Sequence, residues 1–499
     1  MDVQFHKTMH PCLKRVQWEC QAQEQTQEVK LTDGMPDIGR VLSTWGQVLI
    51  RSKEWNGGEI SVSGGVMTWV MYLPEDGSEP RCIEGWIPFQ MKCDFPNEQQ
   101  DGTIGAMCLL RTIDARSVSA KKLIVRVGVS CQCEVFVPQE VELYSPVELP
   151  EDVQLLKNTY PMSLPTEAGE KAFLMDEVID WPSTNPKIEK IIHYSIQPEI
   201  QDQKVMADKT VFRGNTIVRM LYVGDDGEFY SWDYELPFAQ YAELEQEYGQ
   251  DAIVRIIPAV TSLELDMGGE GQLHLKAGIT GQYVVYEKTM LEIVEDAYST
   301  KRMVELRKES LELPAALDTQ QQVVHADITT DIQGTRIVDI VFNPDNIQTL
   351  QKDDEVELSM RGQFQTLFYD LEHQLQCTVS RWEHQSTLSA DQNCQVISIV
   401  RPNGMAKGNF TGGNLNCKAD IYADIMTEAN QEMPMVIGLQ LSEITPRDKE
   451  QPSLILRKAG TDSLWDIAKQ CNSTVEAISK ANNLQASPEQ EQVLLIPVV

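Results

Sequence analysis

Residues that could carry out chemistry are few in this sequence, and their spacing matches no familiar catalytic motif. The seven histidines, at positions 6, 10, 193, 274, 325, 373 and 384, are scattered and lack the spacing of metal ligands. The patterns H-E-x-x-H, G-x-S-x-G and G-x-x-x-x-G-K-[ST] do not occur. We therefore expect no catalytic residue, no metal site and no cofactor, and we predict that the protein is not an enzyme.

Four short features suggest ligand sites but are better explained as structure. Cys131 and Cys133 could bind a metal, yet both lie on the apolar side of an alternating strand, which favours a buried pair. The GGEG segment at 268–271 lacks the helix and lysine of a phosphate loop and predicts a hairpin tip. The acidic residues of GDDGE at 224–228 are typical of a solvated turn, not of a calcium site. His274 faces away from the apolar stripe and is expected at the surface.

The composition excludes several classes of partner. The chain has 499 residues, of which 42% are hydrophobic, and 75 Asp and Glu outnumber 42 Lys and Arg to give a formal charge of −33. This charge would repel nucleic acid and anionic lipid. The N-terminus has no uninterrupted apolar segment, and no run of about 18 uncharged apolar residues occurs anywhere. The 11 cysteines are irregularly spaced, which fits a reducing cytoplasm better than a disulfide framework. From the length, the missing apolar runs and the cysteines together, we expect a multidomain cytoplasmic protein without membrane insertion.

An internal repeat organises most of the chain. Several residue pairs are separated by exactly 150 positions: Pro36 and Pro186, Gly64 and Gly214, Tyr72 and Tyr222, Gly77 and Gly227, and Leu123 and Leu273. A third, remodelled copy retains Gly362 and Tyr369. We predict a mainly β protein with three tandem β-rich repeats, at 1–165 (with an N-terminal segment), 166–310 and 311–446.

The strands of these repeats are indicated by alternation. Apolar residues occupy every second position from Leu123 to Val137, which predicts a strand with one face on a core. Because strands usually have about five or six residues, we expect this run to bend or bulge near Gly128. Similar runs begin at Leu273 and Leu415. The pattern does not decide between a sheet sandwich and a barrel.

Two other features concern the segments between strands. Ile38, Val41 and Leu42 have an i, i+3, i+4 spacing that permits a short helical turn, and equivalent triplets precede the Gly…Tyr strands of the other repeats. Polar, proline-containing stretches at 146–171, 307–322 and 445–453 are interpreted as linkers.

The C-terminal segment, 451–499, has a different pattern. Residues 463–466 and 473–476 both have the form [ST]-x-x-[DE], in which a Ser or Thr side chain caps a helix. Strand-like residues precede the first motif and recur at 493–497. We predict a small βααβ domain whose core includes Leu464, Ile467, Ile478 and Leu495.

One patch on this domain is the candidate binding site. Trp465 lies next to a capping loop and off the main apolar stripe, where aromatic residues often anchor interfaces. The alternative is that Trp465 only seals the junction between helix and strand. The residues expected to frame a shallow groove for a partner are Gly460, Thr461, Asp462, Trp465, Asn482, Asn483 and Leu484.

The C-terminal segment resembles a LysM domain. The resemblance rests on KAGTDSLWDIA at 458–468 and on ANNL at 481–484. It implies binding of N-acetylglucosamine chains between the first loop and the loop after the second helix. Thr461 is an extra residue in that first loop, and this departure argues against glycan binding.

The repeats resemble SPOCS domains over roughly residues 25 to 445. The shared features are the PDIGRVL-type turn, the Gly-x7-Tyr strand, the Asp-Gly turn and the Pro-Phe pair. Together with the LysM segment they resemble the SipL-type spore coat morphogenetic family of sporulating Firmicutes. The resemblance implies a mother-cell scaffold that docks through LysM onto the coat basement ATPase, stage IV sporulation protein A, at the forespore surface. The alternative is a peptidoglycan-binding protein of cortex or wall, and the ligand of the repeats and the oligomeric state stay open.

Overall fold

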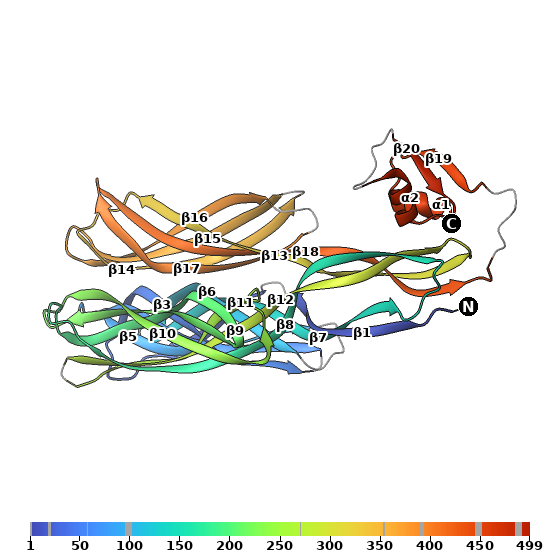
Figure 1. Cartoon of the computed structure of the whole chain (residues 1–499). Helices are drawn as coiled ribbons and strands as arrows, with labels where there is room; N and C mark the ends of the chain where they lie inside the picture. The colour runs from blue at the N-terminus through green and yellow to red at the C-terminus, as the bar shows by residue number, and fades with distance from the viewer. Residues whose placement is uncertain are drawn as a thin grey trace.

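The described part of the chain folds almost entirely as antiparallel β-sheet, with two short helices near the C-terminus (Figure 1). The computed structural model describes residues 2–17, 21–56, 58–94, 102–269, 271–352, 355–389, 394–444, 452–484 and 492–499. The prediction of a mainly β protein is confirmed.

The first part of the chain, which we call sandwich 1, contains two antiparallel sheets packed face to face. One sheet has the order β3-β4-β5, and the other is centred on β7, which pairs with β6 on one side and with β1 and β2 on the other. Its strands are β1 (Phe5–Gln17), β2 (Gln21–Lys30), β3 (Ile38–Asn56), β4 (Glu59–Pro74), β5 (Arg81–Asp94), β6 (Thr103–Ser119) and β7 (Lys122–Pro146).

The same order of strands recurs twice. In sandwich 2, β9 turns at Ala207, which has a φ of 55°, so its two halves take the places of β3 and β4. The strands of sandwich 2 are β8 (Val153–Asp180), β9 (Ile188–Gly224), β10 (Phe229–Tyr248), β11 (Ile253–Met267) and β12 (Gln272–Ser299). Those of sandwich 3 are β13 (Val304–Thr330), β14 (Arg336–Lys352), β15 (Glu355–Tyr369), β16 (Leu375–Ser389), β17 (Cys394–Thr411) and β18 (Asn414–Leu441).

The alternating apolar run of β7 lines the core of sandwich 1. Every second side chain from Leu123 to Cys133 is completely buried, and these side chains pack against β4 and β5. The strand is much longer than expected, and the irregularity near Gly128 lies in its partner, because the register of β6 shifts between Leu110 and Thr112. Cys131 and Cys133 are buried in this core with their sulfur atoms 3.6 Å apart, so the predicted buried pair is confirmed.

The predicted helical turns are wrong, because these residues belong to bulged strands. In β3 the register with β4 shifts between Ile38 and Arg40 and again between Val41 and Ser43. Each bulge adds a residue and changes the phase of the alternation, so apolar residues three or four positions apart can face the same side. A similar shift occurs in β14 between Ile337 and Asp339.

The two glycine-rich motifs form turns. The Gly268 N–H donates to the carbonyl of Gln272 at 2.9 Å, which closes the hairpin between β11 and β12. The Gly224 N–H donates to the carbonyl of Glu228 at the same distance, and Gly227 has a φ of 81° that favours glycine. Both motifs are therefore explained by turn geometry.

The stretches 146–171 and 307–322 are mostly strand, so the linker interpretation is wrong for them. They form parts of two two-stranded ribbons, the start of β8 with the end of β12, and the start of β13 with the end of β18; β1 with the end of β7 forms a third ribbon. The ribbons project beyond the sandwiches toward the N-terminus and form what we call the stalk (Figure 1). Side chains from all three ribbons meet in its core, including Val141, Met162, Leu291, Leu313 and Met433.

The prolines in these stretches are compatible with strands because the strands lie at sheet edges. Pro161 and Pro165 lie in β8, which is the outer strand of the sheet β11-β12-β8. The predicted boundaries 165/166 and 310/311 fall within β8 and β13. Of the third predicted linker, residues 445–451 lie outside the described residues.

The three sandwiches close into a ring, since each one contacts both of the others. The contacts include buried hydrogen bonds from backbone and side-chain donors. They join Ala106 N to Gln282 Oε1 at 2.7 Å (sandwiches 1 and 2) and Trp45 Nε1 to Asp339 Oδ2 at 2.9 Å (1 and 3). A partly buried bond joins Gly404 N to Glu199 Oε1 at 2.9 Å (2 and 3). The repeats are therefore packed around a common axis.

Candidate functional site

The C-terminal domain has the predicted βααβ order. Its elements are β19 (Leu454–Lys458), α1 (Leu464–Gln470), α2 (Val475–Asn482) and β20 (Val493–Pro497), and β19 pairs antiparallel with β20. Ile467, Ala468, Ile478, Leu494 and Ile496 are completely buried between the helices and the sheet.

Both helices begin at a capped residue, but the second cap differs from the prediction. Ser463 caps α1 by accepting the N–H of Asp466 at 3.1 Å. The cap of α2 is Thr474, which accepts the N–H of Ala477 at 3.0 Å. Ser473 is fully buried, and its hydroxyl donates to the carbonyl of Pro497, so it ties the helix start to the end of β20 instead.

The prediction that Leu495 is a core residue is wrong. Leu494 and Ile496 point inward, so Leu495 between them lies on the opposite face of the sheet and is only partly buried. The run VLLIP contains no polar residue that would reveal the phase of the strand.

The first loop of the predicted groove is exposed. Gly460, Thr461 and Asp462 follow β19, and Gly460 has a φ of 60° with open space around it. The carboxylate of Asp462 forms an ion pair with Arg457, which also donates to Gln470 at 2.7 Å. This pairing holds the loop against the start of the domain.

The second part of the predicted groove is largely structural. The Asn482 side chain donates to the carbonyl of Leu495 at 2.6 Å and accepts its N–H at 2.7 Å, which fastens α2 to β20. Asn483 ends the helix in the left-handed conformation and is exposed. Leu484 packs partly buried against the core, and its N–H donates to Ser479 at 3.0 Å.

Trp465 contacts the stalk, not the exposed loop. Its indole N–H donates to Asp296 Oδ2 at 2.9 Å, and its ring packs edge-on against Tyr298 at 4.7 Å between centroids. Both partners belong to β12. Trp465 is therefore part of a contact between the C-terminal domain and the stalk.

Two more groups complete this contact, which we call the docking contact and define as Asp296 and Tyr298 with Trp465, Lys469 and Ser473. Lys469 Nζ lies 2.6 Å from Asp296 Oδ2, and the Tyr298 hydroxyl donates to the carbonyl of Ser473 at 2.8 Å. Tyr298 is almost completely buried and joins the core of the C-terminal domain.

The electrostatics favour a charged Asp296 in this contact. Burial raises the pKa of its carboxyl, but hydrogen bonds from Lys469, Trp465 and Lys308 outweigh burial and lower the pKa below 3.8. Lys308 of the neighbouring strand lies 3.1 Å from the other carboxylate oxygen. Sequence reasoning did not find Asp296 or Tyr298, because no local pattern links them to a helix about 170 residues away.

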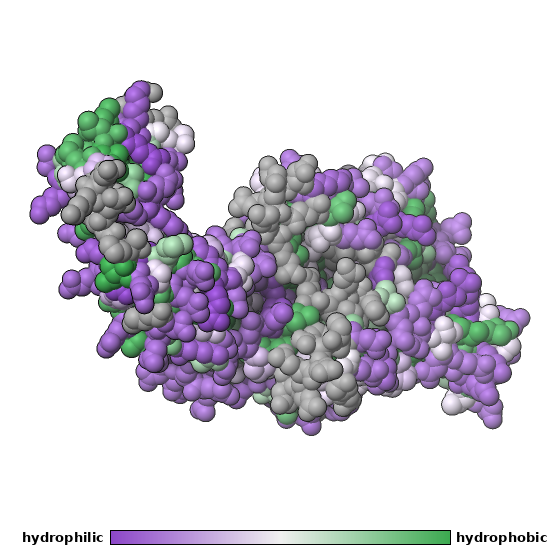
Figure 2. All heavy atoms as spheres, turned by 90° about the vertical axis from the view of Figure 1, so that its right-hand side faces the viewer, coloured by the Kyte–Doolittle hydropathy of each residue, from purple (hydrophilic) through white to green (hydrophobic). Residues whose placement is uncertain are grey.

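The sheet of the C-terminal domain exposes an apolar surface on the side away from the helices. Leu454 is 47% exposed, Leu456 69% and Val493 55%. The register places these residues and Leu495 on one side of the sheet, which we call the outer face. Figure 2 shows hydrophobic atoms exposed on this domain where it rises above the rest of the molecule.

Among the described residues, no group of three or more His, Cys, Asp or Glu side chains is arranged to hold a metal ion. No helix in the described ranges is long and apolar enough to cross a membrane. His274 is partly exposed, and its ring nitrogen lies 2.5 Å from Asp176.

Comparison with known families agrees with this organisation. Residues 187–267, which cover β9, β10 and β11, match the model of the SipL, SPOCS domain. Residues 461–497 match the LysM domain. No curated protein and no solved structure matches the chain. The two domains fit a non-enzymatic sporulation or cell-wall-binding adaptor. The chain therefore carries a SipL-type SPOCS domain in its second sandwich and a LysM domain at its C-terminal end, as the resemblance predicted.

Proposed function

We propose that this protein is a scaffold of spore coat assembly, and that its LysM domain docks onto the coat basement ATPase, stage IV sporulation protein A, at the forespore surface in the mother cell. The three sandwiches are then the body that the LysM domain attaches to the coat.

The observation that carries the choice of a protein partner is the exposed outer face of the LysM sheet. Leu454, Leu456 and Val493 present apolar surface that a protein partner would remove from water. A sugar chain presents mainly hydroxyl groups, so it would gain less from this surface. The amide of Asn482, a candidate groove residue, is engaged within the domain.

The exposed loop Gly460, Thr461 and Asp462 remains a proposed partner-binding element, together with Asn483 and Leu484. Asn482 and Trp465, whose polar groups are bonded within the protein, are proposed to support that site indirectly. Because Trp465 is bound to the stalk, we propose that it acts by holding the LysM domain in a fixed orientation. A fixed orientation would lower the entropic cost of binding and favour simultaneous contacts with a repetitive coat lattice.

The test is a pull-down of purified basement ATPase with full-length variants. Leu456→Asp should lower recovery about tenfold or more, since a charge on the outer face would be desolvated on binding. Leu350→Asp is the matched control, because Leu350 is 55% exposed on β14, far from the LysM domain in the sequence and on another sheet. Equal recovery of Leu456→Asp and the unmodified protein would contradict the outer face as the docking surface.

Two further variants separate direct from indirect roles of Trp465. If Trp465 acts through the docking contact, Trp465→Ala and Asp296→Ala should lower recovery equally. A loss with Trp465→Ala alone would mean that the indole touches the partner. Deletion of 451–499, followed with a fluorescent fusion in sporulating cells, should abolish retention at the forespore surface.

The alternative function is peptidoglycan binding in cortex or wall, which the LysM match and the exposed loop 460–462 favour. Sedimentation with insoluble peptidoglycan distinguishes the two functions. Pelleting without any protein partner, reduced by Asp462→Ala but not by Leu456→Asp, would support the glycan reader and overturn the adaptor.

A further inference from the structure

A cavity of about 610 Å³ lies where the three sandwiches meet. Its walls include β3 and β6, β9 and β11, and β14 and β17, which are corresponding strands of the three sandwiches, and β12, β13 and β18 also contribute residues. Corresponding positions line it in the first two: Gln47 and Gln197, and Met107 and Ile257, are each 150 residues apart. The cavity therefore follows from the closure of the ring and not from one loop.

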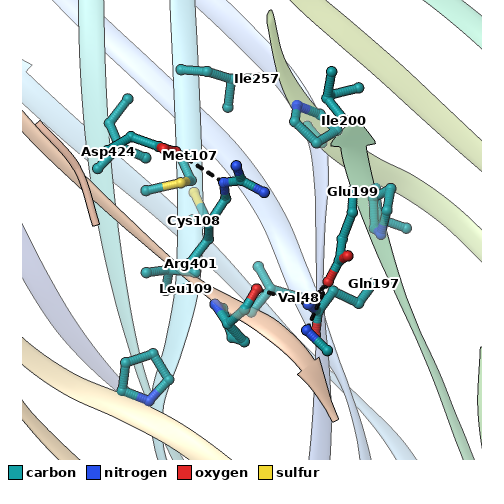
Figure 3. A pocket seen from close by; sticks show the side chains of 18 of the residues that line it. Val48, Met107, Cys108, Leu109, Gln197, Glu199, Ile200, Ile257, Arg401 and Asp424 are labelled. Carbon is teal, nitrogen blue, oxygen red and sulfur yellow. Dashed lines mark hydrogen bonds and ion pairs between the residues drawn. The ribbon is translucent and has the colours of Figure 1, made fainter. Parts of the chain in front are cut away.

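The cavity is elongated and mostly apolar in its wall. It follows β9 from Ser195 to Gln203, which corresponds to roughly 26 Å at the rise of an extended strand. Figure 3 shows Val48, Met107, Leu109, Ile200 and Ile257 around the space, together with the Arg401–Asp424 ion pair. Gln197 and Glu199, which Figure 3 also labels, add polar groups to this wall.

Polar groups without partners gather in one part of the lining. Tyr286 is 2% exposed, and its hydroxyl has no hydrogen-bond partner among the described residues. The Nε–H of Arg255 is likewise buried without an acceptor in the described part of the chain, although the other guanidinium nitrogens bind Glu134. An unpaired buried donor is costly, so these two groups call for an acceptor supplied from outside the chain.

The charges near Tyr286 are compatible with an anion. Burial raises the pKa of the Tyr286 hydroxyl; of the nearby charges, Arg255 and Arg15 lower this pKa, and Glu134 and Glu428 raise it. Burial is the main reason why the pKa of Glu428 is raised, so this carboxyl takes up a proton more readily than an ordinary glutamate. Arg15 forms an ion pair with Glu428 and Arg255 forms one with Glu134, so the positive charges would be in excess, and could compensate an anionic group, only with Glu428 protonated.

We propose that this cavity binds an elongated amphiphile, with an unbranched apolar chain along the axis of the ring and a carboxylate head accepting hydrogen bonds from Tyr286 and Arg255. Arg255 Nε–H can only donate, so the head must offer an oxygen acceptor. The apolar wall contributes the chain specificity, and the two donors orient the head. The site would lie in the SPOCS-bearing body and is independent of the docking function proposed for LysM.

The test uses palmitate as the probe and the purified full-length protein. Isothermal titration should give saturable binding with one site per chain. Tyr286→Phe removes only the unpaired hydroxyl, so it should weaken palmitate binding about tenfold while leaving thermal stability unchanged or higher. Tyr283→Phe is the matched control, because Tyr283 lies on the same strand outside the cavity lining and should leave palmitate affinity unchanged.

Two additional arms separate the head from the chain and from a folding defect. Palmitate methyl ester should bind to the unmodified protein about tenfold more weakly than palmitate does. The Tyr286→Phe variant should bind the ester and palmitate with equal affinity. Ile257→Trp, which fills the cavity, should abolish binding of both while circular dichroism keeps the β spectrum. Absence of saturable palmitate binding, or binding that Ile257→Trp leaves unchanged in a folded protein, would overturn the proposal.

Discussion

The indole N–H of Trp465 donates to the carboxylate of Asp296 at 2.9 Å, and this bond joins the LysM domain to the stalk. Asp296 also accepts Lys469 from the next turn of the same helix, and Tyr298 two residues further fills the core of the domain. One short segment of β12 thus provides both a charged anchor and an aromatic anchor. The LysM domain therefore depends on β12 for part of its core and for its attachment, although its own strands and helices all lie near the C-terminus.

Removing the anchor should free the domain. Asp296→Ala takes away the acceptor of Trp465 and Lys469, so we expect the docking contact to open while the LysM fold persists. Hydrogen exchange measured by mass spectrometry should rise at 296–299 and stay unchanged in the buried part of α2. Asp176→Ala, at the surface partner of His274, is the control, and unchanged exchange at 296–299 would contradict the prediction.

Adjacent residues of β20 should respond differently to truncation. Ile496→Ala removes a completely buried side chain and should destabilise the LysM domain by about 2–5 kcal/mol. Leu495→Ala acts on the outer face and should cost less than about 1 kcal/mol. Urea unfolding followed by hydrogen exchange in α1 and α2 measures both, and equal effects would contradict the assigned faces.

The two repeated glycines should be intolerant of a side chain. A Cβ at Gly214 would clash with the carbonyl oxygen of Glu199. A Cβ at Gly64 would clash with the carbonyl oxygen of Leu49, and both residues of this pair lie 150 positions before their counterparts in the first pair. We expect Gly214→Ala and Gly64→Ala each to cost about 3 kcal/mol or more in urea unfolding. Gly269→Ala is the control because its Cβ would meet open space, and the same loss there would refute the explanation.

His193 should make stability depend on pH. Burial and, to a smaller extent, Arg219 lower its pKa to about 3, and its ring lies between Trp45 and Trp69. The unfolded chain titrates near about 6.5, so the unfolded state binds a proton that the native state excludes. The contribution of neutral His193 to the free energy of unfolding is present above about pH 6.5. It is lost as the pH falls toward 3, and the loss reaches about 2 kcal/mol at pH 5.

The corresponding measurement compares urea unfolding at pH 7 and pH 5. His193→Phe keeps an aromatic ring between the tryptophans. Between pH 7 and pH 5, the free energy of unfolding of this variant should fall by about 2 kcal/mol less than that of the unmodified protein. His325→Gln is the control, because the His325 side chain is 68% exposed. Identical pH dependence in His193→Phe and the unmodified protein would disprove the linkage.

Local patterns were sufficient for much of the fold. Alternation identified the core face of β7, the offset of 150 positions identified the correspondence between Gly64 and Gly214, and a Ser-x-x-Asp motif identified the start of α1. These features depend on neighbours within a few residues or on internal similarity, and both are visible in the chain itself.

Tertiary structure decided what covers each apolar face and where each polar group finds its partner. The sequence by itself determined a strand-rich, triplicated chain with a capped βααβ domain at its end. It could not show that the proline-containing stretches meet in a common stalk, that Trp465 binds Asp296, or that the closed ring encloses a cavity. The physical reason is that period and composition specify which side of an element is apolar, whereas the partner of that side depends on how distant strands pack together.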